Sequence, residues 1–266
     1  MFGIIKWGLW ERRWSIFWWC IGLIAFIVLN LVFYPTIRDQ AAEFEKSLAG
    51  IPESARGFLS DTGEFVSPAG YLSSQVYYLL LPLLLGILAI NLGNTLIGRE
   101  EREKTIELIL SRPISRSRLL LAKITVAIIV LSIVGLASTL CIIIMANIVD
   151  LELTTANIAL ASFASLVLAT TFGAIALSIT LLGKKARIAS IGIATIVALG
   201  GYVLVSLIGL ADWIKWPSKL FPFYYYKPAE ILLGTYNWNN FLVIVAMLII
   251  PLAITWFIFT KRDISS

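Results

Sequence analysis

Long runs of apolar residues alternate with short polar segments along most of the chain. Six of these runs reach the roughly 20 residues that a helix needs to cross the ~30 Å hydrocarbon core of a bilayer. None shows the period-2 alternation of a transmembrane β-strand, and only helices and closed barrels satisfy their backbone groups in lipid. The pattern therefore predicts an all-α, polytopic membrane protein, whose six spans cover residues 14–34, 71–97, 119–148, 157–182, 188–210 and 240–260.

Residues 1–13 and residues 35–70 lie outside these spans and differ from each other in pattern. Residues 1–13 mix aliphatic side chains and two tryptophans with Lys6, Arg12 and Arg13, which is typical of a helix lying in the membrane interface. Residues 35–70 contain no run long enough for a span. They are predicted to form an extracellular loop.

Residues 211–239, before the last span, are rich in aromatic side chains. One interpretation is an interfacial aromatic belt, in which the rings lie at the level of the lipid headgroups. The other is a re-entrant segment, broken by Pro217, Pro222 and Pro228, that lines the outer mouth of a pathway. The sequence leaves both open.

Lysine and arginine are distributed unevenly between the segments that flank the spans. If the N-terminus is cytoplasmic, the cytoplasmic segments hold 15 of these residues and the extracellular ones 6. The positive-inside rule then predicts that both termini face the cytoplasm. No internal repeat or linker divides the chain, so we expect one domain of 266 residues in the cytoplasmic membrane.

Composition excludes several classes of function. The chain is 59% hydrophobic and 14% charged, with a mean hydropathy of +0.90. It has no histidine, and its two cysteines, Cys20 and Cys141, lie within apolar runs. Zinc chemistry, histidine acid–base catalysis and a Cys/His nucleophile pair are therefore not expected. We predict no enzyme, no metal or cofactor site and no nucleic-acid partner.

The spans carry no charged residue near their middle, so no intramembrane relay for protons or ions is visible. Energy for uphill transport would have to enter from outside the bilayer. Neutral polar side chains do occur in the spans and are interpreted mainly as helix–helix contacts. They are Asn30, Asn91, Asn94, Thr170, Thr171, Ser178, Thr180, Ser190, Thr195 and Ser206. Pro82 and Pro251 are expected to kink their helices.

Residues 98–124 interrupt the apolar pattern with 11 of the chain's 37 charged residues, which are 21 Lys or Arg and 16 Asp or Glu. Glu100 and Lys104 form a favourable i,i+4 pair, which predicts a helix at the start of this block. Pro113 then ends that helix, because the residue before a proline is pushed out of the α region. Ser115 or Ser117 can cap the next helix. A solvated loop is the simpler alternative to this helix–turn–helix docking element.

The same block resembles the cytoplasmic motif of ABC-2 type permeases, the membrane subunits of type-2 ABC exporters. The matching residues are Thr105, Ile106, Glu107, Leu110, Ser111, Pro113, Ile114, Ser115, Arg116 and Lys123. Lys104 and Ala122 stand where the family motif has glycine, and Lys104 favours a continuous helix at that point. The number of spans and the interfacial N-terminal helix are similar to the family over the whole chain.

The resemblance implies that residues 98–118 contact a separate ATPase subunit and transmit its movement. On the motif, the residues that would make this coupling contact are Glu100, Glu103, Thr105, Glu107, Arg112, Pro113 and Arg116. The chain contains no phosphate-binding G-x-x-x-x-G-K-[ST] loop, so ATP and Mg²⁺ would bind to the partner. By the resemblance, two ATPases would join two permeases, as a homodimer or a heterodimer.

The cargo is the least defined part of the hypothesis. Candidate residues of the substrate pathway are Asn91 and Asn94 in the second span and Tyr224 and Tyr225 in the aromatic segment. So apolar a protein favours a hydrophobic or amphipathic cargo, such as a lipid, a peptide or a drug. The alternative is a membrane subunit of the same type whose role is signalling or the maturation of a metalloenzyme.

Overall fold

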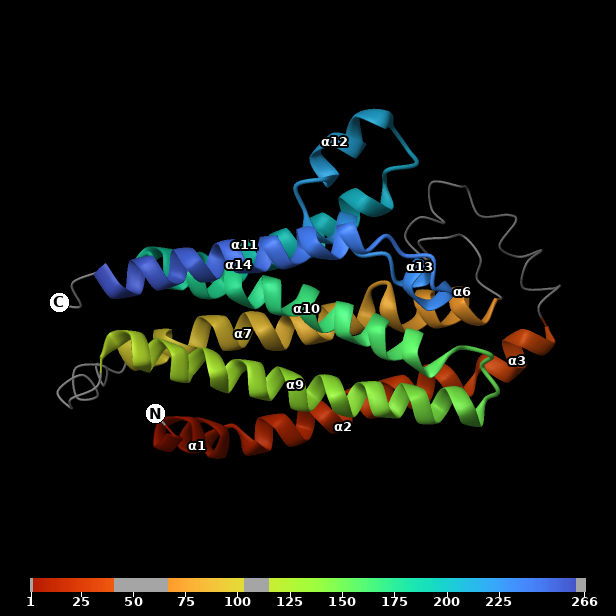
Figure 1. The fold of residues 1–266 in the computed structure, drawn as a ribbon, viewed down its shortest axis with the longest axis horizontal. Helices are drawn as coiled ribbons and strands as arrows, with labels where there is room; N and C mark the ends of the chain where they lie inside the picture. Colours follow the sequence, from red (N-terminus) through yellow and green to blue (C-terminus); the bar gives the residue numbers. More distant parts are fainter. Residues whose placement is uncertain (1, 41–66, 103–114, 262–266) are drawn as a thin grey trace.

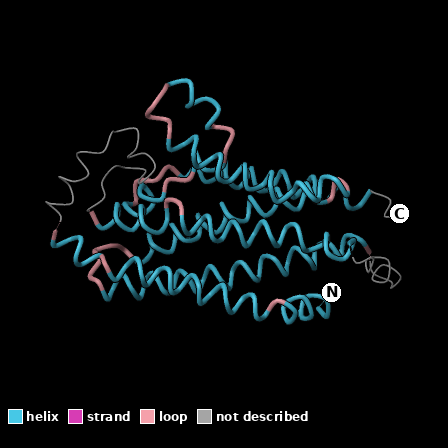
Figure 2. Tube along the Cα trace, turned by 180° about the vertical axis from the view of Figure 1, so that it is seen from behind, coloured by secondary structure: helices cyan, strands magenta, loops and turns pink. Residues whose placement is uncertain are grey.

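The computed structural model describes residues 2–40, 67–102 and 115–261, without the side chains of residues 99–102. Within these ranges the elements are helices joined by loops and turns, with no strand (Figure 2). Six helical segments of the described chain are long and apolar enough to cross a membrane, namely Arg13–Asp39, Pro68–Gly98, Arg116–Ile148, Thr155–Thr180, Lys184–Ser206 and Trp238–Lys261. The prediction of an all-helical protein with six long apolar helices is confirmed.

The six segments are built from more than six elements. The long helices are α2 (Arg13–Val32), α7 (Leu80–Arg102), α9 (Arg116–Ile148), α10 (Thr155–Thr180), α11 (Lys184–Ser206) and α14 (Trp238–Lys261). The short ones are α1 (Phe2–Glu11), α3 (Tyr34–Asp39), α6 (Pro68–Leu72), the π-helix η1 (Ser73–Tyr77), the 3₁₀-helices η2 (Asp212–Ile214) and η3 (Pro222–Tyr225), α12 (Lys215–Ser218) and α13 (Pro228–Leu233). Most of the predicted loop 35–70 lies outside the described residues.

The long helices form an elongated bundle around α7 and α10 (Figure 1). Most residues of these two helices are buried, whereas few residues of α2 and α14 are. α10 contacts α7, α9, α11 and α14, so it is the central helix of the bundle. α2 lies against α9 through the stripe Leu23, Ile27 and Leu31, which the spacing of four residues places on one helix face.

α7 and α10 approach each other so closely that no side chain fits between them at two positions. A Cβ atom on Gly93 would collide with the carbonyl oxygen of Gly173, and a Cβ on Gly173 would lie 2.8 Å from the carbonyl oxygen of Ala89. Small residues allow this kind of backbone contact between membrane helices, where van der Waals packing replaces the hydrophobic effect. The two helices therefore form a tightly packed pair.

The second span is not one regular helix. α6 leads into the π-helix η1, in which Tyr78 donates its N–H to the carbonyl of Ser73, five residues back, at 2.7 Å. α7 begins only at Leu80. The interruption lies just before Pro82, which has no N–H to give to the preceding turn. The expected kinks at Pro82 and Pro251 stay predictions, and α14 continues through Pro251 as one helix.

The predicted N-terminal helix forms as α1. Ile5 and Leu9 pack against the core, while Phe2, Trp7 and Trp10 are exposed. α1 packs on α9, where Gly8 lets the backbone approach Val126. Its position in the membrane interface stays a prediction.

The aromatic segment before the last span forms two parts. η2 and α12 project sideways from the bundle with Trp213 and Trp216 exposed (Figure 1). η3 and α13 pack against the bundle and bury Phe223 and Tyr226. Proline begins both of the packed elements, and Gly234 ends α13 at a φ of 76° that favours glycine.

The two ends of the bundle carry different residues. One end holds α1, the end of α7, the start of α9, the turn between α10 and α11, and the end of α14 (Figure 1). Its cations in the described chain include Arg12, Arg118, Lys123, Lys184, Lys185 and Lys261. We call it the basic end. The opposite end, with α3, α6, η3 and α13, is called the aromatic end.

Candidate functional site

The predicted coupling residues extend along the chain from the last turns of α7 to the first residue of α9. Glu100 lies in the last turns of α7. Arg116 is the first residue of α9, and the preceding Ser115 caps this helix by accepting a hydrogen bond from the N–H of Arg118 at 3.4 Å. Of the two serines predicted as caps, Ser115 is therefore the cap. Glu103, Thr105, Glu107, Arg112 and Pro113 lie outside the described residues.

Next to this segment, a buried polar cluster joins α7, α10 and α11. Asn94 of α7 donates to the Ser190 hydroxyl at 2.6 Å and to the Arg187 carbonyl at 3.0 Å, both in α11. Its amide also lies 3.5 Å from the Thr180 hydroxyl of α10, which donates to Ser190 at 3.0 Å. We call Asn94, Thr180, Arg187 and Ser190 the polar node. Such bonds are made inside the protein because lipid offers no alternative partner.

The side chain of Arg187 belongs to the same region. It is 7% exposed, although arginine is rarely buried. A Cβ on Gly98 of α7 would lie 3.3 Å from Arg187 Cδ and 3.1 Å from Thr180 Cγ2. The absence of a side chain at Gly98 thus lets Arg187 and Thr180 pack against the last turns of α7. The node therefore fixes α7 to α10 and α11 directly before the charged segment.

A second contact joins α7 to the N-terminal helices at the basic end. Arg12, between α1 and α2, donates from Nη2 to the Thr95 hydroxyl at 3.3 Å. Thr95 in turn donates to the carbonyl of Asn91 at 2.8 Å. The last three turns of α7 thus contact the junction of α1 and α2, the end of α10 and the start of α11.

The predicted pathway residues Asn91 and Asn94 have different surroundings. Asn94 is 5% exposed and donates within the node, whereas Asn91 is exposed. Residues three apart are neighbours on a helix surface, but here the packing of α10 and α11 covers Asn94 and leaves Asn91 open. The structure therefore does not bring them together at one surface.

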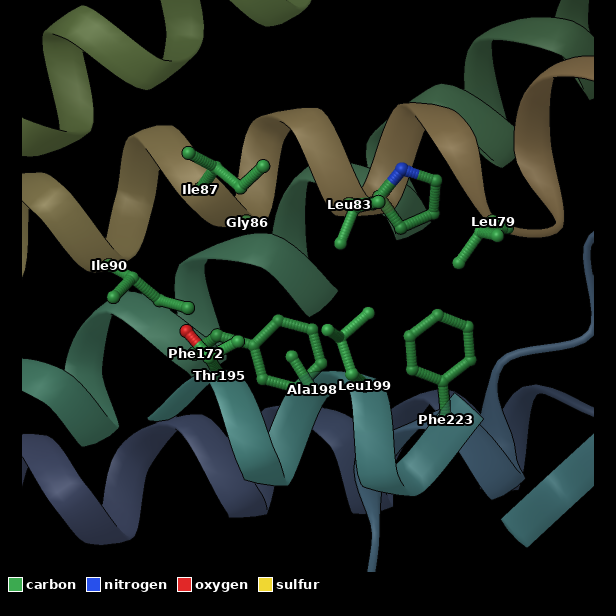
Figure 3. A pocket seen from close by; sticks show the side chains of 11 residues that line it. Leu79, Leu83, Gly86, Ile87, Ile90, Phe172, Thr195, Ala198, Leu199 and Phe223 are labelled. Carbon is green, nitrogen blue, oxygen red and sulfur yellow. The ribbon is translucent and has the colours of Figure 1, made fainter. Parts of the chain in front are cut away.

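An apolar pocket of about 20 Å³ lies between α7 and α11, closer to the aromatic end (Figure 3). Leu83 and Ile90 line it from α7, Thr195 and Leu199 from α11, and Phe223 from η3. We call it the Phe223 pocket. Since α7 and α11 are antiparallel, Ile90 and Thr195 lie about one turn from Asn94 and Ser190. One seam between α7 and α11 thus connects the pocket to the polar node.

Tyr224 and Tyr225 follow Phe223 but do not line this pocket. Their rings pack edge to face, with centroids 5.1 Å apart. The Tyr225 hydroxyl donates to the carbonyl of Lys219 at 3.0 Å, and its own carbonyl accepts from Tyr236 at 2.7 Å. Burial and the nearby Glu230 raise the pKa of Tyr236, so this donor keeps its proton. In this structure both tyrosines shape the aromatic end.

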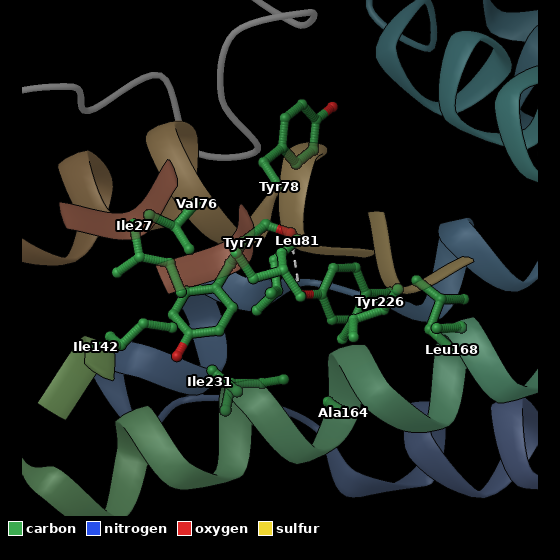
Figure 4. Close-up of a cluster of buried hydrophobic side chains, with 14 of the residues drawn as sticks. Ile27, Val76, Tyr77, Tyr78, Leu81, Ile142, Ala164, Leu168, Tyr226 and Ile231 are labelled. Carbon is green, nitrogen blue, oxygen red and sulfur yellow. Dashed lines mark hydrogen bonds between the residues drawn. The ribbon is translucent and has the colours of Figure 1, made fainter. Parts of the chain in front are cut away.

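Sequence reasoning missed Tyr77 and Tyr226, the two tyrosines that join the interrupted second span to the rest of the aromatic end (Figure 4). Tyr226 donates to the Tyr77 carbonyl at 3.0 Å and lies 2.6 Å from the Ser165 hydroxyl. Tyr77 donates to the carbonyl of Ile158 at 3.1 Å and contacts the Ser162 hydroxyl at 2.7 Å. We call Tyr77 and Tyr226 the tyrosine pair. The sequence signal that could have indicated them was Pro82. A proline has no N–H, so it leaves a carbonyl of the preceding turn without its helical partner and available to a side-chain donor.

Together, the six apolar helices and the polar contacts at their ends define a multi-pass membrane protein. The sequence profile described as "ABC-2 family transporter protein" matches residues 10–264, which is nearly the whole chain. The chain belongs to this family, as the resemblance of residues 98–124 predicted. A comparison with curated proteins found no match. Membrane subunits of this family are normally non-catalytic, and membership implies an ATPase partner. The family has no expected cofactor site in this subunit.

Proposed function

We propose that the chain is the permease subunit of an ATP-driven exporter and moves a substrate across the cytoplasmic membrane. The family match over residues 10–264 carries this proposal. The polar node supports it, because it joins three spans next to the segment in which the coupling motif lies. Hydrogen-bond networks between packed helices are one means by which movement at a contact segment reaches the spans.

In this proposal the basic end faces the cytoplasm, together with both termini and α1 in the interface. The ATPase contacts residues 98–118 through Glu100, Glu103, Thr105, Glu107, Arg112, Pro113 and Arg116. Two permease subunits and two ATPases form the transporter. The whole chain then acts as a single membrane domain.

The movement would pass from the contact segment into α7. This helix has 23 residues, which at 1.5 Å per residue makes a lever of about 35 Å. The node makes the ends of α10 and α11 follow it. At its other end the interruption before Pro82 separates α7 from α6. A displacement at the basic end is therefore delivered to the α7–α11 seam.

For the cargo we propose a path along this seam. The Phe223 pocket is apolar, which favours hydrophobic or amphipathic cargo. Asn91, on the exposed side of α7, and Tyr224 and Tyr225, next to Phe223, remain candidates for contact with the cargo. Asn94 would act in transmission through the node.

The test reverses charge in the contact segment. In the triple variant Glu100→Lys, Glu103→Lys and Glu107→Lys, we expect the ATPase that copurifies with the unmodified chain in mild detergent to be lost. A matched control reverses three acids of the aromatic end, Asp39→Lys, Glu152→Lys and Asp212→Lys, and should retain the ATPase. Retention by both variants would contradict the assignment of the contact segment. Absence of any ATP-hydrolysing partner from the unmodified complex would contradict the function itself.

A further inference from the structure

An apolar slot of about 100 Å³ lies between α7, α9, α10 and α14, and none of its lining residues comes from α11. Ala89 and Gly93 of α7 and Gly173 and Ala174 of α10 form its floor, and all four are buried. Three of them, Ala89, Gly93 and Gly173, are also at the close contact of α7 and α10. Because these side chains are small, an open space remains beside the close contact of the two helices.

The slot opens between α9 and α14. Its rim is formed by Ile124 and Ile128 of α9 and by Leu248 and Leu252 of α14. Ile128 is 50% exposed, and the other three are half-buried. Because these positions lie inside two helices that can span the membrane, the opening faces the hydrocarbon of the bilayer.

The slot offers almost no polar group to a ligand. Its one hydroxyl side chain is Thr170, which donates to the carbonyl of Leu166 at 2.7 Å. Cavities of this size with an apolar lining stay dry and accept small apolar molecules. In a bilayer the apolar groups available to an open cavity are acyl chains.

Two exposed cations lie at the basic end of the helices that form the rim. Arg118 is in the first turn of α9, and Lys261 is the last residue of α14. Near them Phe259 packs in one buried cluster with Leu119 and Leu120, so α9 and α14 meet at this end and the slot is entered from the side. Counted from Arg118, the rim residues of α9 begin about 9 Å further along the helix, at 1.5 Å per residue.

We propose that this slot holds one acyl chain of an anionic phospholipid, whose phosphate lies near Arg118 and Lys261. The length of an acyl chain matches the depth of the slot below the basic end. Leu252 and Leu248 lie about 14 and 20 Å from Lys261 along α14, which is within the reach of an acyl chain that begins at the headgroup. The cations supply charge complementarity to the phosphate, as basic residues at the membrane surface do for anionic lipids. The ligand is a resident lipid and is separate from the exported cargo.

The test is photolabelling of the full-length chain in nanodiscs, with phospholipids that carry a diazirine at mid-chain. We expect labels on peptides containing residues 124–131 and 248–252. Phosphatidylglycerol should label these peptides roughly 30-fold more than phosphatidylcholine, as two basic residues near the headgroup would produce. A diazirine placed next to the ester should label them weakly. The assay needs no ATPase, so its outcome is independent of the proposed function.

Three variants separate the slot from the remaining lipid-facing surface. Ala127→Phe, which fills the slot from α9, should abolish the labels on residues 248–252. Ala253→Phe, at an exposed position of α14 that does not line the slot, should keep them. The double variant Arg118→Gln and Lys261→Gln should make phosphatidylglycerol and phosphatidylcholine equal. Equal labelling by the two lipids in the unmodified chain, or labels spread evenly over α2, α11 and α14, would overturn the proposal.

Discussion

The basic end and the aromatic end both contain buried hydrogen bonds, but they join different kinds of structure. At the basic end, the short side chains of Asn94, Thr180 and Ser190 connect three regular helices directly. At the aromatic end, the longer side chains of Tyr77 and Tyr226 connect irregular pieces, η1 and η3, to α10.

The difference follows from how closely the backbones approach. Short side chains bridge only helices that are already packed, and Gly98 and Gly93 bring α7 against its neighbours near the node. A tyrosine reaches further, and its hydroxyl satisfies carbonyls that an interrupted helix leaves free. We infer that the node keeps three helices moving together, whereas the tyrosine pair holds one particular shape of a broken span.

The strongest test of this contrast is Asn94→Leu. The variant removes the donor that reaches both other helices and leaves buried acceptors with fewer bonds, so we expect a loss of about 2 kcal/mol in the free energy of unfolding. Titration with SDS in mixed micelles measures it. Asn91→Leu, three residues away on the exposed side of α7, is the matched control and should change stability little. Equal losses in both variants would show that the node has no special role.

Tyr226→Phe should have an effect of about 1 kcal/mol, the usual order for a hydrogen bond between membrane helices. It removes the hydroxyl that contacts Ser165 and the Tyr77 carbonyl while the ring stays in place. The same micelle titration measures the loss, with Tyr224→Phe as the control. If the tyrosine pair holds the shape of the broken span, proteolysis should also become faster near η1 in Tyr226→Phe alone. Unchanged proteolysis would contradict that role.

The smallest effect is expected for the helix cap. Ser115→Ala removes the acceptor for the Arg118 N–H, at a cost of about 0.5 kcal/mol for a cap exposed to solvent. Ser117→Ala, two residues into α9, should cost less. Hydrogen exchange at the first turn of α9 measures both. A larger effect of Ser117→Ala would place the start of the helix later than the structure does.

The hydrophobic pattern predicted the six long helices because each span is a long apolar run. The mean hydropathy of such a run is high even where it contains single polar residues. The charged block predicted the family, and Ser115 was one of the two caps expected from its composition. The coupling role of Glu100 and its neighbours stays a prediction.

The pairing of polar residues could not be predicted. Asn91 and Asn94 are the same residue type on the same helix, and only the rotation of α7 decides which of them reaches Ser190. The π-helix changes that rotation within the second span, and nothing in the residues of η1 distinguishes it from a regular helix. Tyr77 was therefore counted as part of an apolar run although it donates to α10.

The contact between Gly93 and Gly173 also limits how the bundle can deform. Sliding α7 along α10 by one residue would bring a Cβ atom against a carbonyl oxygen, so the two helices have lost the shear freedom that most packed helices keep. They can still tilt together as one rigid body. Because the node also joins α11 to this pair at the basic end, a conformational cycle would have to rotate that body against outer helices such as α2 and α14. An inhibitor of the cycle would then need to bind at those outer boundaries.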